Sequence, residues 1–522
     1  MIVLLCRDLE TQSFGMDLDR ISESLRERYA DIEVRVVEGP CDHHEEWLSA
    51  DLRKMAPVVL AVCSSTLPVH ERRAHARKRG FDPCMVETVD LGGICERAES
   101  RERATEQAEI LLRGAVGRCL AETRSIPENF KMIVAWEGRM SRRSLLTLPP
   151  VRYEVVPFVV DEACVADRGC RICEDLCPHD ALTLTSPERM ELLKDKCSAC
   201  GACVSVCPRD AIHFPAASSL QIGAQVEALL DGNSLSSPRG IIFACHNSVG
   251  RFHELSRSGN SILDGWFPVE VPCTGMITPT WILKSLQLGA AAVGLLVCPE
   301  NDCRYGGREE MAGRVDYCST LLNRMGMPSG AVQLVSSDEP DELQEFLAVL
   351  ESLENRRTDQ SPLLPADFSP LGAAGAVRGL AEFKAFPVDL VVAHAHSPLG
   401  NLEVEKGCTL CGACVAACPS DALSMEAGKG EVLSFSPAAC VACGACVPVC
   451  PENVMRTEKV TRLASLMEEE VILFQDTSPR CVTCGKLIMP HAMLNRLKQS
   501  LKDHPSFDII SQYCIDCRKT MF

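Results

Sequence analysis

Cysteine is the residue type of this sequence with the greatest capacity for chemistry, because 31 of the 522 residues are cysteines. The N-terminal sequence shows neither a basic segment nor an extended apolar one, so we expect no secretory signal and a reducing, cytoplasmic environment. In such an environment clustered thiols are more often metal ligands than disulfide partners. The spacing of the cysteines therefore indicates which metal centres the chain can hold.

Three segments repeat the pattern C-x2-C-x2-C-x3-C-P, and they begin at Cys197, Cys408 and Cys440. The pattern resembles that of bacterial two-cluster ferredoxins, in which three cysteines of a run hold one [4Fe–4S] cluster and the fourth closes the neighbouring cluster. Zinc is disfavoured as the metal of these runs, since a zinc site is held by two pairs of thiolates, whereas this sequence contains four runs of four cysteines. For the second pair of runs the resemblance implies two ligand sets: Cys408, Cys411, Cys414 and Cys450 for one cluster, and Cys440, Cys443, Cys446 and Cys418 for the other.

The run that pairs with the one at Cys197 lies upstream and departs from the pattern. Asp167 occupies its first ligand position, and Cys164 lies three residues earlier. Because thiolate is the softer ligand that iron–sulfur clusters prefer, we expect Cys164 to bind and the ligand loop to be enlarged. An oxygen ligand from Asp167, or a three-iron cluster, remains as the alternative. The expected ligand sets are Cys164, Cys170, Cys173 and Cys207 for one cluster, and Cys197, Cys200, Cys203 and Cys177 for the other.

Between the two ferredoxin-like units the sequence alternates strand-like and helix-like segments. Apolar runs at 241–244, 267–271, 291–297 and 331–335 predict strands of a parallel sheet, whose carboxyl ends meet at one edge where ligands bind. Four cysteines fall at this edge and predict a [2Fe–2S] site, with buried core cysteines as the alternative. These four cysteines are Cys245, Cys273, Cys298 and Cys303.

Three parts of this central segment have a distinctive sequence. They are Phe243-Ala-Cys245-His246-Asn247, Val271-Pro-Cys273-Thr-Gly275 and, as the most specific, the run from Leu288 through Cys298 to Cys303-Arg-Tyr305. With these features the segment resembles the delta subunit of methyl-viologen-reducing hydrogenases. The resemblance implies a [2Fe–2S] cluster and a subunit that passes electrons between a dehydrogenase and heterodisulfide reductase.

Residues 1–125 repeat the same alternation, with apolar runs at 2–5, 33–37, 58–62 and 85–91. Cysteines just past the ends of these runs predict a second four-thiolate site for a [4Fe–4S] cluster, with a cluster-free docking domain as the alternative. Segments 58–65 and 81–87 resemble the N-terminal domain of the heterodisulfide reductase A family, which holds a cluster. That family continues with a flavin domain opened by G-x-G-x-x-G, which this sequence lacks, so we predict no flavin. The four cysteines are Cys6, Cys41, Cys63 and Cys95.

The C-terminal segment carries two C-x2-C pairs separated by 29 residues. Two such pairs that close one tetrahedral site are typical of structural zinc, with mononuclear iron or a redox dithiol as the alternatives. The predicted ligands are Cys481, Cys484, Cys514 and Cys517.

The composition predicts a soluble multidomain protein. Its net charge of −18 and its 5% of aromatic residues disfavour nucleic-acid binding, and its longest apolar run is too short to insert into a membrane. The expected fold class is mixed α/β and α+β, with two small open parallel-sheet α/β modules, two bacterial-type 2[4Fe–4S] ferredoxin modules and a C-terminal four-cysteine knuckle. In chain order we expect the first α/β module at 1–150, the first ferredoxin module at 151–216 and the second α/β module at 217–355. A linker at 356–400, the second ferredoxin module at 401–460 and the C-terminal knuckle at 461–522 follow.

No nucleophile–base pair or phosphate-binding loop is visible in the sequence, so we predict no catalytic residues. The predicted function is that of an iron–sulfur electron-transfer subunit in a cytoplasmic oxidoreductase complex. Its partners would be a dehydrogenase or hydrogenase, for which formate dehydrogenase is one candidate, and a heterodisulfide-reductase-like protein or ferredoxin as the acceptor. The alternatives are a disulfide-reducing enzyme that uses the C-terminal thiols, and a redox sensor or assembly factor.

Overall fold

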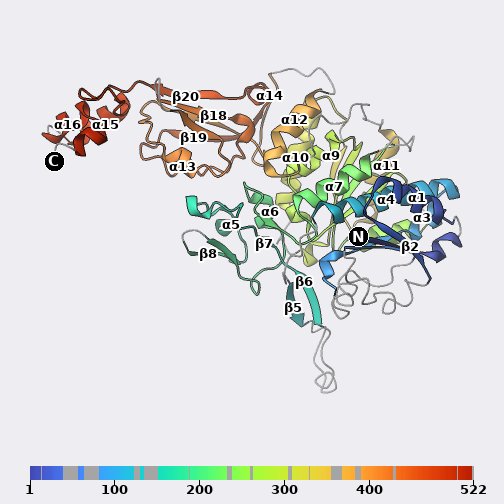
Figure 1. Cartoon of the computed structure of the whole chain (residues 1–522). Coiled ribbons are helices and arrows are strands. Elements are labelled where there is room, and N and C mark those ends of the chain that lie inside the picture. The colour runs from blue at the N-terminus through green and yellow to red at the C-terminus, as the bar shows by residue number, and fades with distance from the viewer. Residues whose placement is uncertain are drawn as a thin grey trace.

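The computed structural model describes most of the chain, and the positions of its modules relative to one another are shown in Figure 1. Two α/β modules lie together on one side, the two ferredoxin-like units lie beside them, and the C-terminal helices lie at the opposite end. None of the described helices has the length and apolar character needed to cross a membrane. The described residues are 1–12, 15–38, 57–63, 81–122, 130–134, 151–186, 189–231, 238–258, 263–303, 308–328, 330–353, 367–382, 389–426, 431–501 and 504–519.

The N-terminal module is a four-stranded parallel sheet with the order β2-β1-β3-β4. Strands β1 and β3 are buried along their whole length, which explains their unbroken apolar sequences. The Asp17 side chain caps α1, and the Ser100 side chain caps α4. The elements are β1 (Ile2–Cys6), α1 (Leu18–Arg28), β2 (Glu33–Val37), β3 (Val58–Val62), β4 (Val86–Asp90), α3 (Gly92–Arg97) and α4 (Arg101–Ala121).

The central module repeats this topology, since its parallel sheet has the order β12-β11-β13-β14. Pro279 occupies the first turn of α9 after Thr278, a position where its fixed backbone angle favours a helix start. The elements are α7 (Ser219–Leu230), β11 (Gly240–Cys245), α8 (Val249–Arg257), β12 (Trp266–Val271), η6 (Thr274–Met276), α9 (Pro279–Gln287), β13 (Ala292–Val297), α10 (Glu309–Arg324), β14 (Val332–Ser336) and α11 (Pro340–Ala348). The parallel α/β architecture expected from both segments is therefore confirmed.

The two α/β modules pack together through α4 and α7. A methyl group added at Gly114 would lie 2.8 Å from Leu229 Cδ2, so glycine allows the helices to approach closely. The buried Arg118 of α4 reaches across and donates to the carbonyls of Ala216 and Glu270 at 2.7 and 3.0 Å. This pairing satisfies a charge that would be costly to bury alone.

The two ferredoxin-like units consist of short antiparallel strands around the cysteine loops. Short helices of about one turn lie within the cysteine runs. The first unit contains β7 (Phe158–Val159), η4 (Ala166–Arg168), α5 (Ile172–Asp175), β8 (Leu182–Ser186), β9 (Arg189–Leu192), α6 (Ala202–Val206) and β10 (Ile212–His213), and follows the hairpin of β5 (Phe130–Val134) and β6 (Val151–Val155). The second contains β16 (Gly400–Val404), α13 (Ala413–Ala417), β17 (Leu423–Glu426), β18 (Glu431–Phe435), β19 (Met455–Arg462) and β20 (Val471–Asp476).

The segment expected to be a linker contains regular structure between the central module and the second unit. Helix α12 (Ala373–Glu382) packs against α9 and α14 (Leu463–Leu466), and β15 (Val391–Ala393) pairs with β19. The buried face of α12 includes the small side chains of Ala373, Ala374 and Ala376, so the expected linker contains a packed helix. A buried hydrogen bond of 2.6 Å between Tyr317 and Thr461 adds to this interface.

The interface between the α/β modules yields a stability prediction. Replacing Arg118 by Met leaves the carbonyls of Ala216 and Glu270 without their donor, and we expect a loss of about 3 kcal/mol of stability. The loss is measured as a lower thermal midpoint of the anaerobically purified protein. The matched control is Arg251→Met on α8, which removes a surface ion pair with Glu254 and should change the midpoint little. Equal midpoints for the two variants would contradict the role given to Arg118.

Candidate iron–sulfur and metal centres

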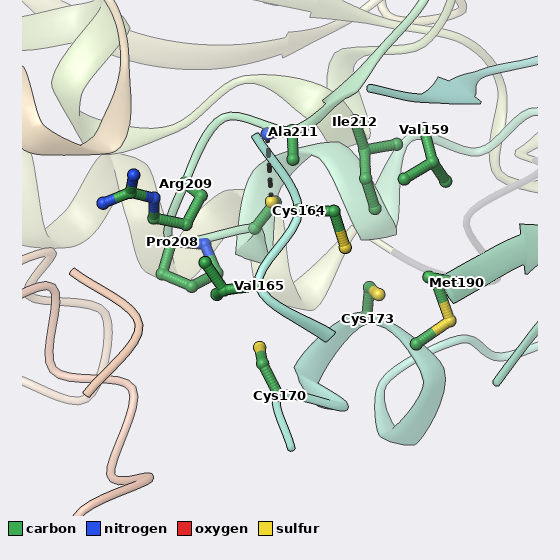
Figure 2. A pocket seen from close by; sticks show the side chains of 11 residues that line it. Val159, Cys164, Val165, Cys170, Cys173, Met190, Pro208, Arg209, Ala211 and Ile212 are labelled. Atoms are coloured by element: carbon green, nitrogen blue, oxygen red, sulfur yellow. Dashed lines mark hydrogen bonds between the residues drawn. The ribbon is translucent and has the colours of Figure 1, made fainter. Parts of the chain in front are cut away.

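Four cysteines of the first ferredoxin-like unit line a cavity of about 370 Å³, and three of them come from one run while the fourth comes from the next. Figure 2 shows Cys164, Cys170 and Cys173 around this space, beside the apolar side chains of Val159 and Ile212. The fourth cysteine, Cys207, accepts a hydrogen bond from the Ala211 N–H at 3.2 Å. We call these four cysteines quartet A; they are Cys164, Cys170, Cys173 and Cys207.

The position of Asp167 separates it from quartet A. Among the described residues that line the cavity, Cys164 is present and Asp167 is not. The residues inserted between Cys164 and Cys170 form the short helix η4, which ends at Gly169 in the left-handed conformation. The Asp167 side chain is exposed on this helix. The geometry therefore favours the thiol over the carboxylate as the cluster ligand.

The second ferredoxin-like unit has two cavities of about 390 and 370 Å³, and each is lined by four cysteines. In both, three cysteines of one run meet the last cysteine of the other run. We call the set at the larger cavity quartet C and the other quartet D. Quartet C is Cys440, Cys443, Cys446 and Cys418, and quartet D is Cys408, Cys411, Cys414 and Cys450.

The remaining cysteines of the first unit form quartet B, whose thiols are near enough to interact electrostatically. Burial raises the pKa of the Cys203 thiol well above its usual value, and the neighbouring Cys197, Cys200, Cys173 and Cys177 raise it further. Backbone N–H groups donate to sulfur here as well, from Ala181 and Ala199. Quartet B is Cys197, Cys200, Cys203 and Cys177.

The loops of the three regular runs adopt one backbone shape. The residue before the second cysteine has a positive φ in each loop, which is unusual for a residue other than glycine. The glycine after the second cysteine is also left-handed in each loop, with φ of +74° to +78°. These turns bring three sulfur atoms to one side of the loop, and they are Ala199-Cys200-Gly201, Leu410-Cys411-Gly412 and Ala442-Cys443-Gly444.

The donor sets fit iron–sulfur clusters. Burial raises the pKa of the Cys173 thiol to about 12, and the adjacent Cys207, Cys170 and Cys164 add to this effect. Four crowded thiols therefore resist ionisation until a cation neutralises them, and thiolate is the ligand form that iron and sulfide require. Hydrogen bonds from backbone N–H groups to sulfur stabilise the more negative form of such a centre.

The central module brings its four predicted cysteines together at the carboxyl edge of its sheet. Cys245 ends β11, Cys298 follows β13, and Cys273 lies two residues after β12. Contact with the Cys273 thiol raises the pKa of Cys245 to about 12, and the Cys298 thiol contacts both Cys245 and Cys303. This arrangement of four thiols fits the predicted [2Fe–2S] cluster.

The N-terminal module brings together only part of its predicted set within the described residues. The Cys6 sulfur lies 3.6 Å from the Cys63 sulfur and 3.6 Å from an Asp8 carboxylate oxygen. Cys95 is fully buried, and its thiol faces the Leu9 carbonyl instead. Cys41 lies outside the described residues. Asp8 was not among the ligands predicted from the sequence. Its position two residues after Cys6, which ends a strand, could have indicated a place in this metal site.

The C-terminal cysteines form a compact four-sulfur group whose ligand atoms lie within 4.8 Å of one another. The Cys484 and Cys514 sulfur atoms are 3.4 Å apart. Hydrogen bonding from the Cys514 backbone lowers the pKa of Cys481 to about 6, so this thiol ionises readily. Such a set fits one tetrahedral zinc ion. The group consists of Cys481, Cys484, Cys514 and Cys517.

Comparisons with protein families agree with this geometry for three parts of the chain. Residues 241–356 match the family described as methyl-viologen-reducing hydrogenase, delta subunit. Residues 407–454 match a 4Fe-4S dicluster domain, and residues 191–213 match a 4Fe-4S binding domain. Among curated proteins none matches the chain. The two ferredoxin-like units are thus 4Fe–4S ferredoxin domains, and the chain is an iron–sulfur electron-transfer protein with a delta-subunit-like central module.

The exposure of Asp167 and the position of Cys164 give a direct test of quartet A. Replacing Cys164 by Ser should remove about four irons or change the electron paramagnetic resonance (EPR) signal of one cluster, because a thiolate ligand is lost. Asp167→Asn is the matched control and should leave both the iron content and the spectrum unchanged. Loss of iron from the Asp167 variant, with normal iron in the Cys164 variant, would reverse the assignment.

The C-terminal group can be tested independently of the iron centres. Replacing Cys517 by Ser should lower the zinc content from about one atom per chain to near zero, because three thiolates hold zinc less tightly than four. The iron content should stay constant, as metal analysis by mass spectrometry can show. Lys486→Met is the control, since it removes the surface ion pair with Asp516 and leaves all four sulfur ligands in place. A concurrent loss of iron would argue against a separate zinc site.

Proposed function

We propose that this protein is an electron-transfer subunit of a cytoplasmic oxidoreductase complex. It relays electrons between a dehydrogenase or hydrogenase, with formate dehydrogenase as one candidate, and a heterodisulfide-reductase-like protein or ferredoxin. The observation that carries the proposal is that cysteine quartets C and D each surround a cavity in a segment that matches a 4Fe–4S dicluster domain. Quartet A surrounds a similar cavity, and its Cys207 lies in the segment 191–213 that matches a 4Fe–4S binding domain. The delta-subunit-like module beside them supports a place in a hydrogenase-type complex.

In this proposal the four quartets hold [4Fe–4S] clusters, and the central cysteines hold a [2Fe–2S] cluster. Bound clusters supply one-electron redox chemistry. The protein fixes the positions of the sulfur ligands, buries them and donates backbone hydrogen bonds to them, which together set each potential. The N-terminal module would hold a further [4Fe–4S] cluster, in line with its resemblance to the N-terminal domain of the heterodisulfide reductase A family. We propose zinc for the C-terminal group and no flavin.

The contact between quartet B and the central cysteines supports a continuous path. A methyl group added at Gly201, in the loop of quartet B, would lie 2.8 Å from Met276 Cβ in the segment that follows Cys273. The buried Arg314 joins the two segments, because it donates to the carbonyl oxygen of Gly275 at 2.9 Å and to the Ser205 hydroxyl at 3.0 Å. The two sites therefore lie on facing loops held by one guanidinium group.

A metal count on the anaerobically purified chain tests the proposal. The full set of centres predicts about 22 irons with matching sulfide. It also predicts about one zinc. About 16 to 18 irons would mean that one or both α/β sites are empty, so that these modules act as docking scaffolds. Iron far below this level, or no reduction of the clusters by reduced methyl viologen, would rule out an electron relay.

A second candidate function is supported by the C-terminal thiols. The pKa of the buried Cys481 thiol is lowered to about 6, whereas the exposed Cys484 thiol has a raised pKa. Without bound metal, Cys481 would be the thiol that ionises and attacks a disulfide once it becomes accessible. The same metal count distinguishes the two functions. Absent zinc together with two reactive thiols, measured with a thiol reagent, would favour a disulfide-reducing enzyme over a relay subunit.

A further inference from the structure

The two ferredoxin domains contact each other through the Asp421 carboxylate. Arg168 of the first domain donates from Nη1 to Asp421 Oδ1 at 2.6 Å, and Arg209 donates from Nη1 to Oδ2 at 3.0 Å. The same Arg168 nitrogen lies 3.5 Å from the carbonyl oxygen of Cys418. One carboxylate of the second domain is thus shared by two guanidinium groups of the first.

These charged residues lie next to the cysteines that close two of the quartets. Arg209 follows Cys207 of quartet A by two residues, and Asp421 follows Cys418 of quartet C by three. Asp421 has a left-handed backbone with φ of 55°, which directs the chain back after the Cys-Pro pair. Asp210, at the same distance after the Cys-Pro pair that ends the second run of the first domain, has the same conformation but pairs with His213 of its own domain. Asp421 instead reaches across the interface.

The same contacts bring the loops of quartets A and C together. Arg168 lies two residues before Cys170 of quartet A, and it bonds to Asp421 and to the carbonyl oxygen of Cys418 of quartet C. Quartets B and D make other contacts: B faces the central module, and the Glu452 carboxylate beside D pairs with Arg496 of α15 (His491–Leu501).

We propose that quartets A and C form the junction through which electrons pass between the two ferredoxin domains, and that Asp421 is the positioning residue of this junction. The inference rests on the proposed function, in that both quartets must hold clusters. Clusters held by the two quartets would exchange one electron, from the reduced cluster to the oxidised one, and no bond or proton would change place. The electrons come from the redox partner or, in the test, from dithionite.

The charges at the junction determine the expected behaviour. Two guanidinium groups and one carboxylate lie beside both quartets, and reduction makes a cluster more negative. Removing the carboxylate leaves two adjacent positive charges, which stabilise the reduced form of each neighbouring cluster and so raise its potential. The domain interface should otherwise survive, because the buried Tyr317–Thr461 hydrogen bond and the packing of α12 hold the second domain to the central module.

The test is a redox titration of the full chain with dithionite, followed by EPR spectroscopy. In Asp421→Asn we expect wild-type iron content, upward shifts of the potentials of two clusters, one in each domain, and unchanged potentials of the other two [4Fe–4S] clusters. The magnetic interaction between the two shifted clusters should weaken, since the paired guanidinium groups repel each other. Asp421→Glu keeps the charge and should behave like the wild type.

A matched control lies in the same domain. The Glu405 side chain is 57% exposed, close to the 55% of Asp421, and it pairs with Arg456 at 3.2 Å within its own domain. Glu405→Gln should leave the potential of quartet A unchanged. Cys170→Ser and Cys443→Ser identify the two signals, because an oxygen ligand alters the spectrum of the cluster that it holds.

Two results would overturn the junction. One is a normal iron content with no potential shift in Asp421→Asn, and the other is a shift confined to one domain. If the Asp421 variant does not fold, Arg209→Gln tests the same idea with the opposite sign, because loss of a positive charge should lower both potentials. A wild-type chain without iron in its ferredoxin domains would instead refute the proposed function, so the two failures are distinguishable.

Discussion

Each cysteine quartet gathers four thiols near one another although their ionised forms repel one another. The raised pKa values of Cys173, Cys203 and Cys446 express the cost of burying an anion together with this repulsion. A structure can maintain such crowding only if the surrounding backbone is fixed and a cation offsets the repulsion. The left-handed turns of the cysteine loops and the cross-over between runs provide the first condition, and bound iron would provide the second.

The two α/β modules also gather several thiols, but they do so at the ends of strands and not within one cysteine loop. Parallel strands end along one edge, so cysteines far apart in sequence meet there without any local pattern. Cys6 and Cys245 end the first strands of their sheets, and Cys63 and Cys298 follow the third strands. The two modules therefore place thiols at equivalent positions of one topology. In the N-terminal module Asp8 adds a carboxylate beside these thiols, and an oxygen donor would favour a harder metal than a pure thiolate set.

The sequence predicted what depends on short-range spacing. The cross-over ligand sets of the ferredoxin domains follow from loops of a few residues, and the cavities contain those cysteines. Contacts that depend on tertiary packing could not be predicted from the sequence. They include the burial of Cys95 against Leu9 and the helix α12 within the expected linker. They also include the pairing of Asp421 with two arginines of the other ferredoxin domain. Nothing local distinguishes Asp421 from Asp210, because both follow a Cys-Pro pair at the same distance.

Electron transfer between fixed centres requires that their separation does not vary, and the interfaces of this chain are built accordingly. Buried polar side chains cross them: Arg118 joins the two α/β modules, Arg314 joins the central module to the first ferredoxin domain, and Tyr317 joins it to the second. A buried polar group resists separation because each partner would be left without a hydrogen bond. The C-terminal group is attached differently, through the partly exposed Arg496–Glu452 pair beside quartet D. A surface pair of this kind stabilises weakly, so it contributes less at this end of the chain than the buried contacts contribute at the other interfaces.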